Sequence, residues 1–151
     1  MSAKFSVRLA QEADLPAIAP LFDAYRQFYR QSPDVAGAQA FLQQRMQLAQ
    51  SQILLAQAED GRLAGFTQLY PVFSSVSMRP AWILNDLYVH PEFRQQGVAS
   101  ALLQAAIAHG RSSGAAWISL QTAHDNAAAQ ALYRQHGFTQ EEKYLSFNYA
   151  L

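Results

Sequence analysis

The stretch WILNDLYVHPEFRQQGVAS, residues 82–100, decides the fold, because it holds a strand, a turn and the start of a helix. Its first part, Trp82–Val89, is strand-like, and His90-Pro91 ends it, since proline cannot donate to a strand ladder. Gly97 allows a tight turn, and apolar residues at helical spacing predict a helix from about Val98 to Ala108. The stretch therefore predicts a buried strand that leads directly to a helix N-terminus.

The chain after this stretch continues to alternate strands and helices. Ala116–Leu120 is expected to form another strand, and Asn126–His136 a helix that ends at Gly137. Tyr144–Leu151 alternates apolar and polar residues and predicts a last strand.

The N-terminal part predicts one strand and two helices. Phe5–Leu9 alternates as a half-buried strand does, and Asp14 is a candidate cap for a helix that runs to about Arg30. The residues Ser32-Pro33-Asp34 break this helix, and a second amphipathic helix through Phe41 is expected to end near Gln50.

Two strands of a hairpin follow these helices. Ile53–Ala56 and Leu63–Tyr70 flank the turn residues Glu59–Gly61 and should pair antiparallel. Pro71–Pro80 contains three serines and two prolines and is expected to be a loop or a short edge region. The complete order predicts one α+β domain over residues 1–151, with a mostly antiparallel sheet and a βαβ-like second half.

Composition excludes several functional classes. The chain has no cysteine, so it can hold no disulfide, no thiolate zinc site and no cysteine nucleophile. Eleven basic residues balance eleven acidic ones, which argues against a nucleic-acid partner, and the four histidines suggest no metal site. No apolar run approaches the roughly 20 residues of a membrane span, and no signal peptide is visible, so a cytoplasmic protein without a membrane partner is expected.

Two motifs carry candidate chemistry. The turn Arg94–Ser100 precedes a helix and can present backbone N–H groups to a phosphate, although an ordinary strand-to-helix turn has the same composition. It matches neither the nucleoside-triphosphate loop nor the dinucleotide loop. Asn126 and Tyr133 are seven residues apart and share one helix face, where they can serve a ligand or be a cap and a core aromatic.

Together these motifs resemble the GNAT superfamily of N-acetyltransferases. The resemblance rests on Leu84–Pro91, Arg94-x-x-Gly97-x-Ala99 and the run from Asn126 to Phe138, which occur in the family's order and spacing. It implies a GNAT-like fold, with a central, mostly antiparallel mixed sheet that contains a parallel splayed pair and has helices on both faces.

The resemblance also implies acetyl-CoA as co-substrate and direct transfer of its acetyl group to an amine, without an acyl-enzyme. The pantetheine arm would follow the splayed strand, the pyrophosphate would lie on the loop amides, and Asn126 would touch the cofactor arm. A backbone N–H on this strand, at or near Tyr88, would meet the developing oxyanion. The cofactor-binding residues implied in this way are Leu87, Tyr88, Val89, Arg94, Gln95, Gln96, Gly97, Val98, Ala99, Ser100 and Asn126.

Tyr133 matches the family position that donates a proton to the departing thiolate, a role that suits a phenol. The acceptor amine must lose a proton, and Asp86 is the first candidate base, with Glu92 the second. Asp86 can equally orient a loop or bind the cationic substrate.

The strand is particularly similar to the spermidine/spermine acetyltransferase branch, in which two acidic residues occupy the places of Asn85 and Asp86. The amide at Asn85 puts polyamine specificity in doubt, and a small amine, an amino acid or a lysine-like group is expected. Tyr25 and Tyr29 are candidate acceptor-binding residues, although plain packing explains their spacing equally well.

Two other functions stay open. One is an acyl-CoA-binding sensor with little catalysis, and the other is acetylation of a protein or peptide amine. The resemblance also implies a homodimer, for which the aromatic Tyr144–Tyr149 strand is a candidate edge.

Overall fold

The computed structural model describes residues 5–151, which form two compact parts divided after Gln121. The larger part contains a five-stranded sheet in the order β1-β2-β3-β4-β5. Its strands are β1 (Phe5–Leu9), β2 (Gln52–Ala58), β3 (Leu63–Ser74), β4 (Arg79–Val89) and β5 (Ile118–Ser119). The pairs from β1 to β4 are antiparallel, and β4 and β5 are parallel. This arrangement confirms the mixed, mostly antiparallel sheet.

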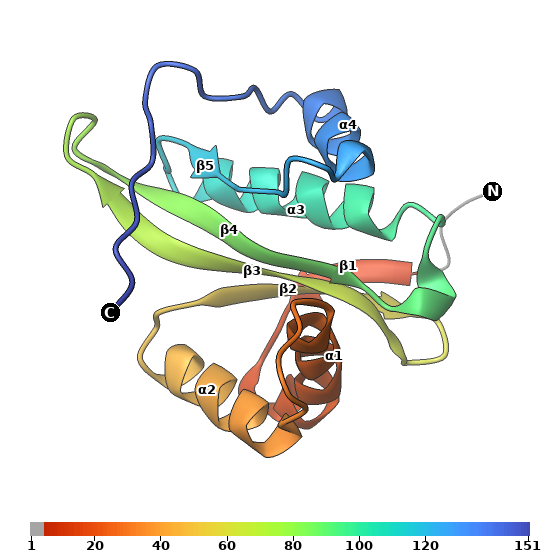
Figure 1. Cartoon of the computed structure of the whole chain (residues 1–151). Helices are drawn as coiled ribbons and strands as arrows, with labels where there is room; N and C mark the ends of the chain where they lie inside the picture. Colours follow the sequence, from red (N-terminus) through yellow and green to blue (C-terminus); the bar gives the residue numbers. More distant parts are fainter. Residues whose placement is uncertain (1–4) are drawn as a thin grey trace. The chain divides into compact units, whose positions relative to one another are not determined.

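Three helices cover the two faces of this sheet (Figure 1). They are α1 (Leu15–Phe28) and α2 (Val35–Gln47) on one face and α3 (Val98–Ser112) on the other. Between α1, α2 and the sheet, Ile18, Leu42 and Phe66 are fully buried in one apolar cluster. On α3, the buried residues are those of the expected stripe, which include Val98, Leu102, Leu103 and Ala106.

The second part, residues 122–151, contains one helix, α4 (Ala127–Gln135). Its bounds agree with the expected helix, and Gly137 beyond it has a φ of 93°, which favours glycine. The last strand expected over Tyr144–Leu151 was wrong, because these residues form no strand. Alternation alone does not make a strand, since a strand also needs a hydrogen-bonded neighbour.

The segment Pro71–Pro80, expected to be a loop or a short edge region, instead forms most of a hairpin between β3 and β4. Pro71 pairs with Trp82 and Phe73 with Pro80, and only Ser75–Met78 forms the turn. Each proline removes one ladder donor, but the long β3–β4 pairing supplies the others. The second helix begins at Val35, directly after the expected break, where the Asp34 side chain caps it by accepting a hydrogen bond from the Gly37 N–H at 2.9 Å.

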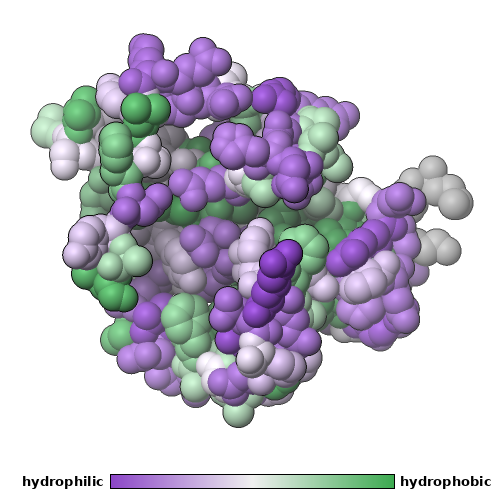
Figure 2. Space-filling model, viewed as in Figure 1, coloured by the Kyte–Doolittle hydropathy of each residue, from purple (hydrophilic) through white to green (hydrophobic). Residues whose placement is uncertain are grey.

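Hydrophilic and hydrophobic residues are mixed over the face of the molecule that Figure 2 shows. Within residues 5–151, no helix is both long enough and apolar enough to cross a membrane.

Candidate functional site

Strand β4 separates from its parallel neighbour partway along its length. Only Trp82 and Ile83 pair with β5, whereas β4 continues to Val89. Beyond Ile83, the β5-side edge of β4 therefore has no paired strand within the sheet of residues 5–121. This is the splay that the sequence implied, and it contains Leu87, Tyr88 and Val89.

A β-bulge occurs on β4 at the same place. Gln68 pairs with Asp86, but the next β3 residue, Leu69, pairs with Leu84, so Asn85 is the extra residue. Asn85 is exposed, whereas Leu84 and Asp86 on either side are buried. A bulge locally increases strand twist and redirects side chains. The Asp86 side chain next to this bulge is buried.

The Asp86 carboxylate is only 3% exposed and lies in a buried polar network. The Gln68 side-chain amide donates to one carboxylate oxygen, and the Asn85 amide donates to the other at 2.9 Å. The Ser51 hydroxyl holds Gln68 in turn, donating to its Oε1 at 2.7 Å. Burial raises the pKa of Asp86 above the ordinary carboxyl range, although the Gln68 hydrogen bond opposes this shift. A carboxyl group in this state is a stronger base than an exposed one.

Tyr25 lies beside Asp86 and packs against two further tyrosines. The Tyr25 hydroxyl donates to the Asn85 carbonyl oxygen at 3.3 Å, and the Tyr25 ring contacts Tyr88, with their centroids 6.2 Å apart. Burial and the nearby Asp86 charge raise the pKa of Tyr25, which keeps its phenol protonated. Tyr29 is exposed and packs on Tyr25, with ring centroids 5.1 Å apart. Tyr25 therefore lies beside Asp86, whereas Tyr29 packs on Tyr25 and is exposed to solvent.

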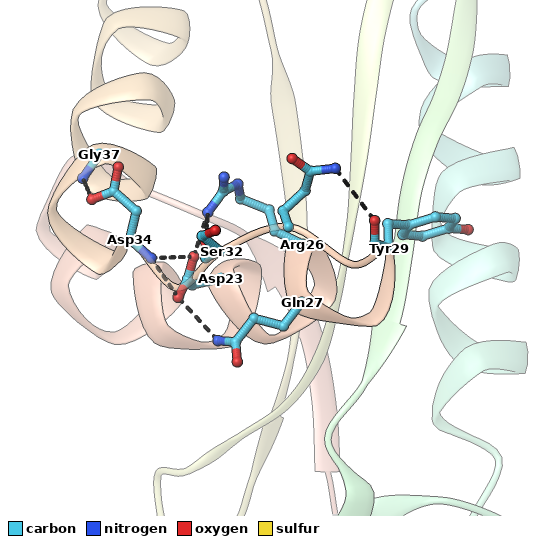
Figure 3. Close-up of polar contacts among 8 residues, drawn as sticks. Asp23, Arg26, Gln27, Tyr29, Ser32, Asp34 and Gly37 are labelled. Carbon is cyan, nitrogen blue, oxygen red and sulfur yellow. Dashed lines mark hydrogen bonds and ion pairs between the residues drawn. The ribbon is translucent and has the colours of Figure 1, made fainter.

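A buried carboxylate holds the segment between α1 and α2, which borders these tyrosines (Figure 3). Asp23 is 1% exposed and pairs with Arg26 at 2.7 Å. It also accepts hydrogen bonds from the Gln27 side chain and the Asp34 backbone N–H, both at 3.1 Å. Burial alone would raise the pKa of Asp23, but these donors lower it below the usual value. The network therefore fixes the entry to α2.

The loop between β4 and α3, residues 90–97, has the geometry of an anion site, and we call it the anion loop. Gln95 and Gly97 have positive φ values of 61° and 83°, and Gly97 is the N-cap of α3. Gly97 is exposed, and a Cβ atom there would meet nothing within 4 Å, so its positive φ rather than crowding favours glycine. Arg94 is exposed, its Nε donates to the Val89 carbonyl at 3.2 Å, and its guanidinium lies 5.6 Å from the Tyr88 ring centroid. These residues fit a phosphate-bearing cofactor, with backbone amides and one cation at the same loop.

Gly65 on β3 allows the end of β4 and the start of α3 to pack closely against it. A Cβ atom there would lie 2.7 Å from the Tyr88 carbonyl oxygen and 3.1 Å from Val98. We expect Gly65→Ala to reduce the free energy of unfolding by about 1–3 kcal/mol, because backbone must move to relieve the overlap. Chemical denaturation measures this change, and a loss under about 0.5 kcal/mol would contradict the close packing.

Glu92, the second candidate base, is engaged elsewhere. Its carboxylate is exposed and pairs with Arg62 at 2.6 Å, and the Arg62 guanidinium also lies over the Phe93 ring. Arg79, the first residue of β4, donates to the Gly114 and Ala115 carbonyls. Within residues 5–151, no group of three or more histidine and acidic side chains could hold a metal ion.

The second part of the chain carries the two remaining candidates. The Asn126 side chain accepts from the Ala129 N–H at 3.1 Å and so caps α4. Tyr133 is on the last turns of α4, and its ring centroid is 6.1 Å from that of Phe138. The proposed contact of Asn126 with a cofactor and the proton donation by Tyr133 stay predictions.

Sequence reasoning missed two residues of the Asp86 region. These residues are Gln68 and Tyr70 on β3. Because the sequence predicted a strand over Leu63–Tyr70, it could have shown that both side chains lie on one face of that strand. The bulge at Asn85 had no sequence signal, because it depends on the register between β3 and β4.

Comparison with known proteins agrees with this geometry. Residues 18–138 match the model of the acetyltransferase (GNAT) family. The chain is 46% identical over 142 residues to an uncharacterized N-acetyltransferase, YhfO, of Bacillus subtilis (strain 168), covering 94% of this chain and 95% of that protein. It is 28% identical over 122 residues to an aminoglycoside N(6')-acetyltransferase type 1 of Stenotrophomonas maltophilia, covering 79% and 80% of the two chains.

A solved structure is similar over nearly the whole length. The crystal structure of a probable acetyltransferase superposes with a TM-score of 0.93 at 38% identity and covers 97% of both chains. The match to the family model spans most of the sequence, and the splayed parallel pair that the resemblance implied is present. The chain therefore belongs to the GNAT family of acetyltransferases.

Proposed function

We propose that this acetyltransferase moves the acetyl group of acetyl-CoA directly to the primary amine of a small amine, an amino acid or a lysine-like group. The observation that carries the proposal is the buried Asp86 carboxylate, whose pKa is raised and which lies on the strand that leads to the anion loop. The amine must lose its proton before it attacks, and Asp86 is a base suited to accept it.

Residues of β4 and the following loop hold the co-substrate in this proposal. The unpaired edge of Leu87, Tyr88 and Val89 offers main-chain groups to the pantetheine arm. The amides from Gln95 to Ser100, together with Arg94, hold the pyrophosphate. Asn126 contacts the arm, and Tyr133 gives a proton to the leaving thiolate as the C–S bond breaks.

The aminoglycoside relative supports a second acceptor class, an aminoglycoside amine. A peptide amine and a sensor role are the further alternatives. A single domain, a homodimer and a cytoplasmic location stay predictions. Residues 144–149, which were expected to form the edge strand of the dimer, form no strand. Sedimentation at several protein concentrations would test the homodimer.

The decisive experiment measures thiol release from acetyl-CoA with a panel of amines, amino acids, aminoglycosides and short peptides. The proposal expects release that depends on both acetyl-CoA and a small amine. Binding of acetyl-CoA in calorimetry without release from any acceptor would favour the sensor role, and failure to bind acetyl-CoA would overturn the proposal.

A further inference from the structure

Among residues 5–151, Arg45 is a cation without an anionic partner, and it lies at the end of α2. It lies in the last turn of α2, where its Nε is buried and has no hydrogen-bond partner among the described residues. Within residues 5–151 Arg45 forms no ion pair, and it differs from the equally unpaired but exposed Arg94 and Arg111 in its buried Nε. Its guanidinium lies over the exposed Phe41 ring, 5.1 Å from the centroid. A partly desolvated guanidinium with an unused donor favours an anion that supplies the missing acceptor.

The fold places Arg45 on the same layer as Asp86. Leu42, one turn earlier on α2, is fully buried in the cluster with Ile53 and Phe66, so this side of the helix faces the sheet. Phe66, Gln68 and Tyr70 alternate along β3 and share that sheet face. Gln68 hydrogen-bonds Asp86 and accepts a hydrogen bond from Ser51, which follows α2, so Tyr70, two residues further along β3, shares the face of this network.

Tyr70 supplies a neutral donor between the two charges. Burial and the Asp86 charge raise its pKa to about 12, and the Arg45 charge acts in the opposite direction. Both charged groups are therefore within electrostatic reach of this phenol, which stays protonated near neutral pH.

We infer that Arg45 and Tyr70 form a carboxylate-binding subsite, so that the acceptor is an amine that also carries an anionic group, as an amino acid does. The inference rests on the proposed function. The two ends of such a substrate match the two charges of the site, with the amine at Asp86 and the carboxylate at Arg45 and Tyr70. A polyamine or an aminoglycoside presents several cations and no carboxylate, so it would bring positive charge to Arg45.

Matched acceptor pairs test this inference. Each pair is an amino acid and its carboxamide, which keeps the amine and the chain length but removes the negative charge. We expect kcat/KM to be about tenfold or more higher for the amino acid, mainly through KM, because a charge-assisted hydrogen bond remote from the reacting atoms strengthens binding.

Arg45→Gln should abolish this preference by lowering kcat/KM more for the amino acid than for the amide. Arg45→Lys should keep part of the preference, since it retains the charge but not the guanidinium fork, and Tyr70→Phe should weaken it. Arg111→Gln, at an exposed arginine near the end of α3, is the matched control and should keep the preference. Melting temperatures of all variants check that each is folded.

Equal kcat/KM values within the pairs, or an Arg45→Gln effect of the same size on both members, would overturn the subsite. Turnover of an aminoglycoside that is faster than that of every amino acid and is unchanged in Arg45→Gln would also overturn it. If no amine releases thiol, the proposed function fails, but the subsite is still measured by calorimetry in the presence of CoA. Amino acid binding that Arg45→Gln abolishes would then support it, and absence of binding to the unmodified chain would refute it.

Discussion

Asp86→Asn is expected to lower kcat by about 10²- to 10⁴-fold with any good amine acceptor, the range associated with loss of a general base. Asparagine has nearly the same volume as aspartate but cannot accept the proton of the attacking amine. Both Asp86 oxygens accept hydrogen bonds, from Gln68 and Asn85, so the new amide would face one donor. The exposed Asn85 side chain can turn its oxygen toward that amide, so the fold should survive.

The pH dependence separates a base from a merely structural carboxylate. Asp86 must be ionised to accept a proton, so kcat/KM should rise with pH through its raised pKa, and Asp86→Asn should lose this acid limb. Deprotonation of the free amine contributes to both profiles, so their difference isolates the carboxyl group. An unchanged acid limb together with unchanged acceptor affinity would exclude both roles of Asp86. Glu59→Gln, at an exposed carboxylate in the β2–β3 turn, is the control and should leave the profile unchanged.

The stability of the same variant has a definite sign. Because burial raises the pKa of Asp86, the folded chain binds this proton more tightly than the unfolded chain, in which the pKa is about 3.9. The free energy of unfolding should therefore fall as pH rises from that value through the folded pKa. Asp86→Asn should lack this decline, which urea titrations at several pH values would measure.

Tyr133→Phe is the second large expected effect, a fall in kcat of about 10²-fold through loss of the proton donor to the thiolate. The substitution removes one hydroxyl and keeps the ring that contacts Phe138. Affinity for CoA in calorimetry should change by less than about threefold, since the hydroxyl acts as charge develops on sulfur rather than in binding.

Thiol release under acceptor-saturating conditions checks this effect, and Tyr149→Phe is the control, because its exposed phenol is in the same part of the chain. Retention of kcat within about twofold in Tyr133→Phe would show that another group or water protonates the thiolate.

Local sequence was a reliable guide where local physics is sufficient. The strand–turn–helix unit around Gly97 needed a proline stop, a glycine with positive φ and an apolar helical stripe, and all of these are written in adjacent residues. The same holds for α1 and α4, and for α2, which begins directly after the break at Ser32–Asp34. The pattern at Tyr144–Leu151 failed, since alternation specifies a face but not a partner.

The candidate site also combines features that depend on local sequence with features that depend on tertiary contacts. The sequence by itself indicated the family, and it singled out the loop proposed to bind the cofactor and the candidates Asp86 and Tyr133, because these depend on residue types at fixed spacing along one chain. Only the tertiary structure decided that Asn85 is bulged, that Asp86 is buried with Gln68, and that Arg45 and Tyr70 lie on its layer. Those features depend on strand register and on how α2 packs on the sheet, and both arise from contacts between residues far apart in the sequence.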